Sequence, residues 1–166
     1  MNVAPALRTF RILLIEDNAA DVYLLRQALK NAGLTVELMV IEDGAEALAC
    51  VRRQGKYAGT LIPDLAVVDM NLPKADGIAI LAALRHNEDM SKVLVAMMTS
   101  SAAPRDQAKT QELGIGRFIT KPLELEAFLQ IGQVLKEMLL ESTVSPTIEA
   151  TDRISEGQNV RAGDLP

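Results

Sequence analysis

Five short apolar runs, each rich in valine, isoleucine or leucine, most strongly limit the folds available to this chain. They cover residues 11–15, 35–40, 65–68, 93–98 and 117–119. Runs of this length are too brief for helices and are typical of β-strands. The sequence therefore predicts five strands.

Helical patterns separate these strands, and the second of them, over about residues 45–54, leads into a loop over residues 55–63. After the first run, Val22, Leu25 and Leu29 keep a spacing of three or four residues, and Gly33 stands where a helix ends. The last helix carries one apolar stripe, at Phe128, Ile131, Leu135, Met138 and Leu139. Strands that alternate with helices form right-handed βαβ units and a parallel sheet. We therefore predict an α/β fold, (βα)5, with a doubly wound five-stranded parallel sheet in the flavodoxin-like order 2-1-3-4-5.

Length and composition exclude several classes of protein. The chain has 166 residues, enough for one compact domain and a remnant. Its net charge is −5 and its lysines and arginines form no run, so we expect no nucleic acid partner. Cys50 is the only cysteine, which excludes an internal disulfide and a multi-cysteine zinc site.

Residues 141–166 differ in composition from the rest of the chain. They contain no aromatic residue, two prolines, two arginines and five acidic residues. We predict a domain over residues 9–140 and a flexible tail over residues 141–166. Apolar stretches such as residues 93–98 are far shorter than the roughly 18 residues that cross a bilayer. We expect a cytoplasmic protein without membrane contact.

Polar residues follow the predicted strands at their carboxyl ends. Glu16 and Asp17 follow the first strand, and Asp69 follows the third. Thr99 follows the fourth strand and Lys121 the fifth. In the predicted strand order these ends meet at one edge of the sheet, where ligands of doubly wound folds bind.

Such a cluster of acids needs a cation. Two carboxylates about 4 Å apart repel by about 4 kcal/mol at an effective dielectric constant of 20. Carboxylate oxygens without thiolate or imidazole partners select a hard ion, and Mg²⁺ fits best. A metal ion, the ammonium of Lys121 and the hydroxyl of Thr99 together suit stabilisation of a transferring phosphoryl group.

In these motifs the chain resembles the receiver domain of two-component response regulators, over roughly residues 9–140. The motifs are Ile15-Glu16-Asp17-Asn18, the stretch from Asp69 to Gly77, Thr99-Ser100 and Lys121-Pro122. Within the family it is most similar to single-domain regulators of the chemotaxis type and those that serve bacterial phytochromes. Two segments carry that closer similarity, Ala20-Asp21-Val22 and Gly55-Lys56-Tyr57-Ala58.

The resemblance implies that Asp69 accepts a phosphoryl group from a histidine kinase, of the phytochrome type or another, or from a phosphotransfer protein. It implies that Mg²⁺ is held by Asp17, Asp69, the backbone carbonyl of Asn71 and, through a water, Glu16. Thr99 would donate a hydrogen bond to the phosphoryl group, Lys121 would pair with its oxygens, and Phe118 would be the aromatic residue that reports the switch. The family pattern also places a cis bond between Lys121 and Pro122.

Two other functions remain open on the sequence alone. An Asp-nucleophile phosphohydrolase of the haloacid dehalogenase type has a second acid two residues after its nucleophile, where this chain has Asn71. A receiver-like binding module that works without phosphorylation usually lacks some of the acids or the lysine. Glu16 and Asp17 taken alone also suit the N-terminus of a helix. We expect a phosphoacceptor and not a turnover enzyme.

A phosphoacceptor passes its state on by a change of shape. The resemblance implies that this change occurs around the fourth helix, the fifth strand and the fifth helix, where a downstream protein would bind. Leu139 and Leu140 in the last helix suggest a homodimer. The input signal, the cognate kinase and the target belong to other chains.

Overall fold

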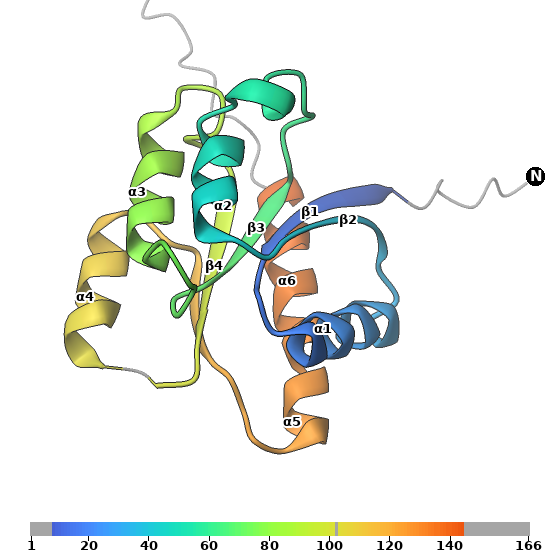
Figure 1. Ribbon diagram of the computed structural model, residues 1–166. Helices are drawn as coiled ribbons and strands as arrows, with labels where there is room; N and C mark the ends of the chain where they lie inside the picture. Colours follow the sequence, from blue (N-terminus) through green and yellow to red (C-terminus); the bar gives the residue numbers. More distant parts are fainter. Residues whose placement is uncertain (1–7, 102, 145–166) are drawn as a thin grey trace, which may run out of the picture.

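The structure is a computed structural model that describes residues 8–101 and 103–144. Its centre is a sheet of five strands: β1 (Thr9–Ile15), β2 (Thr35–Ile41), β3 (Leu65–Asp69), β4 (Leu94–Thr99) and β5 (Arg117–Thr120). Every pair is parallel, in the order β2-β1-β3-β4-β5 (Figure 1). The predicted fold class and strand order are confirmed.

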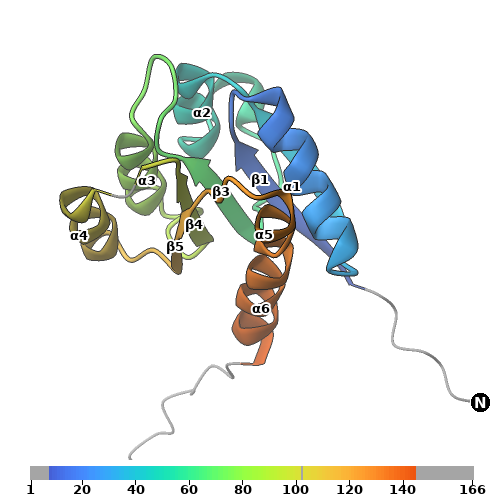
Figure 2. The ribbon, with the colours of Figure 1, turned by 90° about the horizontal axis from the view of Figure 1, so that it is seen from below.

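Helices cover both faces of this sheet. They are α1 (Ala19–Asn31), α2 (Gly44–Val51), α3 (Gly77–His86), α4 (Pro104–Glu112), α5 (Leu125–Leu129) and α6 (Ile131–Val144), with a short 3-10 helix, η1 (Gly55–Tyr57). The helices α2 and α3 lie on one face, and α1, α5 and α6 lie on the other (Figure 2). Only Gln130 separates α5 from α6, so the two helices stand where one was predicted.

The core has two layers because side chains alternate along β1. Leu13 and Ile15 pack with α2 and α3, whereas Ile12 and Leu14 pack with α1 and α6. The predicted stripe of the last helix lies in the second layer, and its residues are at most 5% exposed. All five residues of β3 are buried, as the central strand of a doubly wound sheet requires.

The segment after α2 differs from the prediction. We predicted a helix over residues 45–54 and then a loop over residues 55–63, but α2 ends at Val51. Arg53 takes a positive φ of 56°, which stops the helix, and its guanidinium donates to the carbonyls of Ala58 and Thr60. The hydroxyl of Tyr57 donates to Glu46 at 2.6 Å and holds η1 against α2.

Helix termini follow the sequence signals more closely. The side chain of Asn18 accepts hydrogen bonds from the backbone N–H groups of Ala20 and Asp21 and begins α1. Asp43 begins α2 and Asp76 begins α3 in the same way. Asn18 thereby fixes the start of the helix that directly follows the first acids.

At the other end of the chain, α6 continues to Val144. The predicted tail therefore begins inside this helix, and residues 145–166 lie outside the described part of the chain. The boundary at residue 140 stays a prediction. Among the helices in residues 8–101 and 103–144, none is both long and apolar enough to cross a membrane.

The packing of α1 against α6 depends on a glycine. A Cβ atom on Gly132 would lie 2.0 Å from the carbonyl oxygen of Ala28 in α1. We expect Gly132→Ala to destabilise the protein by about 1–3 kcal/mol net, because overpacking outweighs the roughly 1 kcal/mol by which alanine favours a helix. Urea unfolding measures this loss. Gly59→Ala is the control, since a Cβ there meets nothing within 4 Å, and equal stability of the two variants would contradict the prediction.

Candidate functional site

The carboxyl ends of four neighbouring strands form the candidate site. Asp69 is the last residue of β3 and Thr99 the last of β4. Glu16 and Asp17 directly follow β1, and Lys121 directly follows β5. The parallel order of these strands places all five residues at one edge of the sheet.

Three acids form a compact group at this edge. One carboxylate oxygen from each of Glu16, Asp17 and Asp69 lies within 4.8 Å of the other two. Glu16 and Asp69 are buried, at 2% and 5% exposure, whereas Asp17 is exposed. Three carboxylates at this separation are a donor set that suits a hard divalent cation such as Mg²⁺. The residues present therefore fit a metal ion.

Three carboxylates also surround the ammonium group of Lys121. Its Nζ atom lies 2.7 Å from Oε2 of Glu16, 2.8 Å from Oδ2 of Asp21 and 2.8 Å from Oδ2 of Asp69. The lysine side chain is only 8% exposed. Burial by itself would lower the pKa of Lys121, but hydrogen bonds to the three carboxylates raise it above its ordinary value. Lys121 is therefore a fixed positive charge.

Glu16 responds to burial in the opposite sense. Burial raises the pKa of Glu16 to about 7, although the hydrogen bonds from Lys121 and from the backbone of Asn18 act to lower it. Glu16, Asp17, Asp21 and Asp69 together carry more negative charge than one lysine neutralises. The raised pKa of Glu16 favours its protonated form below about pH 7, and that form would reduce the repulsion among these acids.

Backbone groups orient the two buried acids. The N–H of Asn71 donates to Oδ1 of Asp69 at 2.9 Å, and the N–H of Asn18 donates to Oε1 of Glu16 at 3.0 Å. Each of these carboxylates thus has one oxygen on a backbone N–H and the other on Lys121. Gly77 lets the start of α3 lie against the backbone of Asp69, since a Cβ on Gly77 would be only 2.6 Å from the carbonyl oxygen of Asp69.

Thr99 is joined to the site through hydrogen bonds. Its hydroxyl donates to the carbonyl of Ser101 at 2.8 Å and accepts from the side-chain amide of Asn71 at 3.4 Å. Its own carbonyl accepts from the backbone N–H of Lys121 at 2.7 Å. The hydroxyl therefore lies between the loop after β3 and the loop after β4.

Phe118 is the predicted site residue that lies apart from the acids. It sits in β5, half-buried, and packs against the core layer of α2 and α3. The expectation of a cis bond between Lys121 and Pro122 is wrong, because the described residues contain no cis peptide bond. The trans isomer is the one that a bond before proline favours, by about 0.5–1 kcal/mol.

Asp21 is a site residue that we did not assign from the sequence. The segment Ala20-Asp21-Val22 served only as a mark of similarity to phytochrome-associated regulators. Its place in the first turn of α1, directly after the first acids, was the available signal, because the start of this helix lies at the carboxyl edge of the sheet. The sequence did not indicate that Lys121 is the partner of Asp21, because Lys121 lies 100 residues further along the chain.

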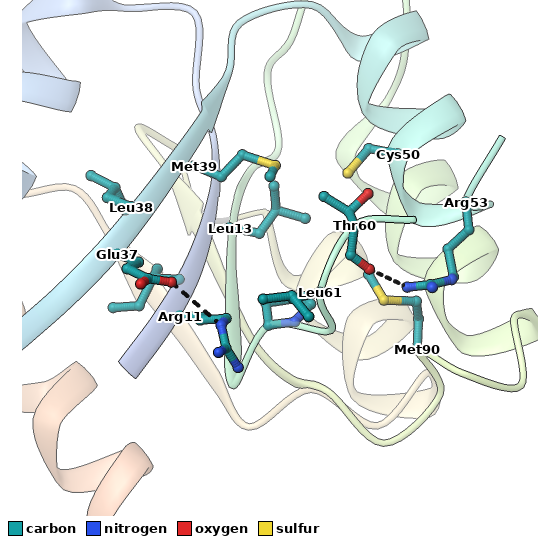
Figure 3. Close-up of a pocket in the computed structure, with 12 residues that line it drawn as sticks. Arg11, Leu13, Glu37, Leu38, Met39, Cys50, Arg53, Thr60, Leu61 and Met90 are labelled. Atoms are coloured by element: carbon teal, nitrogen blue, oxygen red, sulfur yellow. Dashed lines mark hydrogen bonds and ion pairs between the residues drawn. The ribbon is translucent and has the colours of Figure 1, made fainter. Parts of the chain in front are cut away.

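A separate apolar pocket of about 460 Å³ opens beside the middle of β1 and β2 (Figure 3). Leu13, Met39, Cys50, Leu61 and Met90 contribute to its lining. Burial raises the pKa of the Cys50 thiol to about 11, so it is protonated at neutral pH. The pocket lacks the acids and the lysine described above, which belong to the carboxyl edge of the sheet.

The sequence matches the family model of the response regulator receiver domain over residues 12–133. It is 33% identical over 135 residues to the response regulator Rcp1 of Synechocystis sp. (strain ATCC 27184 / PCC 6803 / Kazusa), and the match covers 81% of this chain and 92% of Rcp1. The predicted resemblance to receiver domains, and to phytochrome-associated regulators among them, is confirmed.

Solved structures agree with the sequence comparison. The phosphorylated cyanobacterial phytochrome response regulator RcpA superposes with a TM-score of 0.76 at 33% identity, covering 84% of this chain and 100% of that one. The Mn²⁺-bound form of Rcp1 superposes with a TM-score of 0.74 at 33% identity, covering 82% of this chain and 99% of that one.

The raised pKa of Glu16 predicts a pH dependence of stability in the metal-free protein. From pH 4.5 to about 7 the folded form keeps a proton that the unfolded form releases, so stability should fall as the pH rises through this range. The fall is at most about 3 kcal/mol, and Glu16→Gln should remove it because glutamine does not ionise.

Urea unfolding with a chelator, repeated across this pH range, measures the slope. Glu37→Gln, at an exposed side chain of β2, controls for the loss of one carboxylate. A parent slope unchanged by Glu16→Gln would show that burial of Glu16 does not couple proton binding to folding.

Proposed function

This chain belongs to the response regulator receiver family, and we propose that Asp69 is the residue on which it accepts a phosphoryl group. The observation that carries this proposal is the environment of Asp69, a buried carboxylate 2.8 Å from the ammonium of Lys121 and beside two further acids. A carboxylate in this setting is a nucleophile with a fixed positive charge next to it.

In the proposed reaction, a carboxylate oxygen of Asp69 attacks the phosphorus of a phosphohistidine. A P–O bond forms, the P–N bond breaks, and its electron pair leaves on the imidazole nitrogen. Lys121 stands in contact with the attacking group and pairs with the negative charge that the phosphoryl oxygens bring. Thr99 offers its hydroxyl as a hydrogen-bond donor to the same oxygens once it leaves the carbonyl of Ser101.

We propose Mg²⁺ as the metal ion of this site. A divalent ion there would neutralise charge that otherwise opposes attack on a phosphoryl group. The fit of the three carboxylates and the Mn²⁺-bound form of the similar Rcp1 support a divalent ion. The groups proposed to hold it are Asp17, Asp69, the backbone carbonyl of Asn71 and, through a water, Glu16.

The proposed phosphoryl donor is a histidine kinase or a phosphotransfer protein. Similarity to the phytochrome response regulators Rcp1 and RcpA favours a kinase of the phytochrome type. We propose further that the domain turns over no substrate of its own. Asn71 supports this, because its neutral side chain stands where a haloacid dehalogenase-type phosphohydrolase has its second acid, and its amide is bonded to Thr99.

For the output surface we propose α4, β5 and α5. The helix α4 is polar, and among its residues only Thr110 is buried, so little apolar packing holds it in one place. Phe118 of β5 is half-buried against the core layer of α2 and α3, and we propose that it reports the switch. Leu123 and Leu125, fully and 56% exposed, lie next to β5 and supply apolar surface for a downstream protein.

We propose a homodimer separately, and of the two leucines that suggested it, the structure leaves only Leu140 available. Leu139 is 1% exposed and packs inside its own core, so it is not available to a partner. Leu140 is 45% exposed and remains as the apolar contact that α6 offers.

Phosphorylation of Asp69 is directly testable. The protein incubated with Mg²⁺ and acetyl phosphate should gain the mass of one phosphoryl group, and Asp69→Asn should abolish the gain because the amide is not a nucleophile. Intact-protein mass spectrometry measures it. Asp89→Asn, at an exposed side chain before β4, should behave as the parent does. A folded parent protein that gains no mass would refute the assignment of Asp69.

Metal binding is tested without any phosphoryl donor. We expect Asp17→Asn to weaken Mg²⁺ binding by about ten-fold or more, since even residues that only orient a metal ligand contribute that much. Isothermal titration calorimetry gives the dissociation constants, again with Asp89→Asn as the control. Equal affinities of Asp17→Asn and the parent would remove Asp17 from the proposed ligand set.

A further inference from the structure

The three hydrogens of the Lys121 ammonium each have a separate carboxylate within reach. The acceptors are Glu16, Asp69 and Asp21, at 2.7 to 2.8 Å. Glu16 and Asp69 also belong to the group of acids that fits a cation, but Asp21 does not. Of the three partners of Lys121, Asp21 is therefore the one that is not also proposed to bind the metal ion or the phosphoryl group.

The backbone of Asp21 is fixed independently of this ion pair. Asp21 lies in the first turn of α1, and its backbone N–H donates to the side chain of Asn18 at 3.3 Å. The same helix packs closely on α6 at Gly132. The side chain of Asp21, 22% exposed, thus extends from the first turn of α1 to Lys121 in the loop after β5.

We propose that Asp21 is a positioning residue that keeps the ammonium of Lys121 beside Asp69 during phosphoryl transfer. This inference rests on the proposed function. Glu16 and Asp69 are the acids whose oxygens the metal ion and the phosphoryl group would occupy, so their hold on Lys121 is temporary. A lysine on a flexible four-carbon chain needs one lasting partner to stay in place, and Asp21 supplies it.

A purely structural role predicts something different. An acid in the first turn of a helix stabilises the helix through its dipole. In that case Asp21→Asn would change stability and leave phosphoryl transfer as it was. The negative charge of Asp21 also repels an anionic donor, so its removal by itself would speed the reaction. Positioning alone predicts a slower reaction.

The experiment measures the rate of Asp69 phosphorylation by acetyl phosphate in the full chain, at saturating Mg²⁺ for each variant. About 1 M salt reduces the Debye length to about 3 Å and suppresses repulsion of the donor. We expect Asp21→Asn to be at least about ten-fold slower than the parent, because misplacement of a catalytic group by about 1 Å has effects of this size or larger. Asp21→Glu, which keeps the charge, should recover most of the rate.

Glu46→Gln is a matched control. Glu46 is also a first-turn acid paired with a lysine, Lys56, but in α2 and away from the site. Asp69 in the Glu46→Gln variant should be phosphorylated at the parent rate. Thermal unfolding of all variants separates slower chemistry from loss of folded protein.

A second measurement is independent of activity. In the Mg²⁺-loaded parent, the Nζ hydrogens of Lys121 should exchange slowly enough to give a ¹H–¹⁵N correlation, because the ammonium is buried and Asp21 remains as its acceptor. Asp21→Asn should lose this signal while Glu46→Gln keeps it. If Asp21→Asn reacts at least as fast as the parent, or if it keeps the signal, the positioning role is wrong. If the parent itself gains no phosphoryl group, it is the proposed function that fails.

Discussion

Repulsion among acids gathered at one end of a parallel sheet is the constraint on which this structure depends. Glu16 and Asp69 are buried, and Asp17 and Asp21 lie close by. Lys121 compensates part of this charge through three short contacts, and a proton on Glu16 or a divalent cation compensates more. Binding of a metal ion or of a phosphoryl group, as proposed for this site, would change the same balance of charge.

The fold supplies the convergence and the local backbone supplies the orientation. Parallel strands in the order β2-β1-β3-β4-β5 bring residues that are far apart in sequence to one edge. Backbone N–H groups of Asn18 and Asn71 then turn Glu16 and Asp69 so that each gives an oxygen to Lys121. The position of these two loops is therefore as much a part of the site as the acids themselves.

Much of the architecture could be predicted from the sequence because its signals are local. Short apolar runs marked the strands, and Gly33 marked the end of α1. The prediction failed where a distant group decided the backbone. The helix α2 stops at Val51, where the guanidinium of Arg53 donates hydrogen bonds to the carbonyls of residues 58 and 60. The hydrogen bond from the hydroxyl of Tyr57 to Glu46 holds η1 in place. No periodicity of apolar residues contains such contacts.

The candidate site divides in the same way. The sequence by itself determined which residue types stand at the strand ends, because a polar residue that closes a buried apolar run is visible in the order of amino acids. Only the tertiary structure decided that Asp21 shares Lys121 with Glu16 and Asp69, that Phe118 packs away from the acids, and that Leu139 is internal. The reason is physical: charge compensation and burial depend on distances through space, which the chain acquires only when its strands and helices have packed.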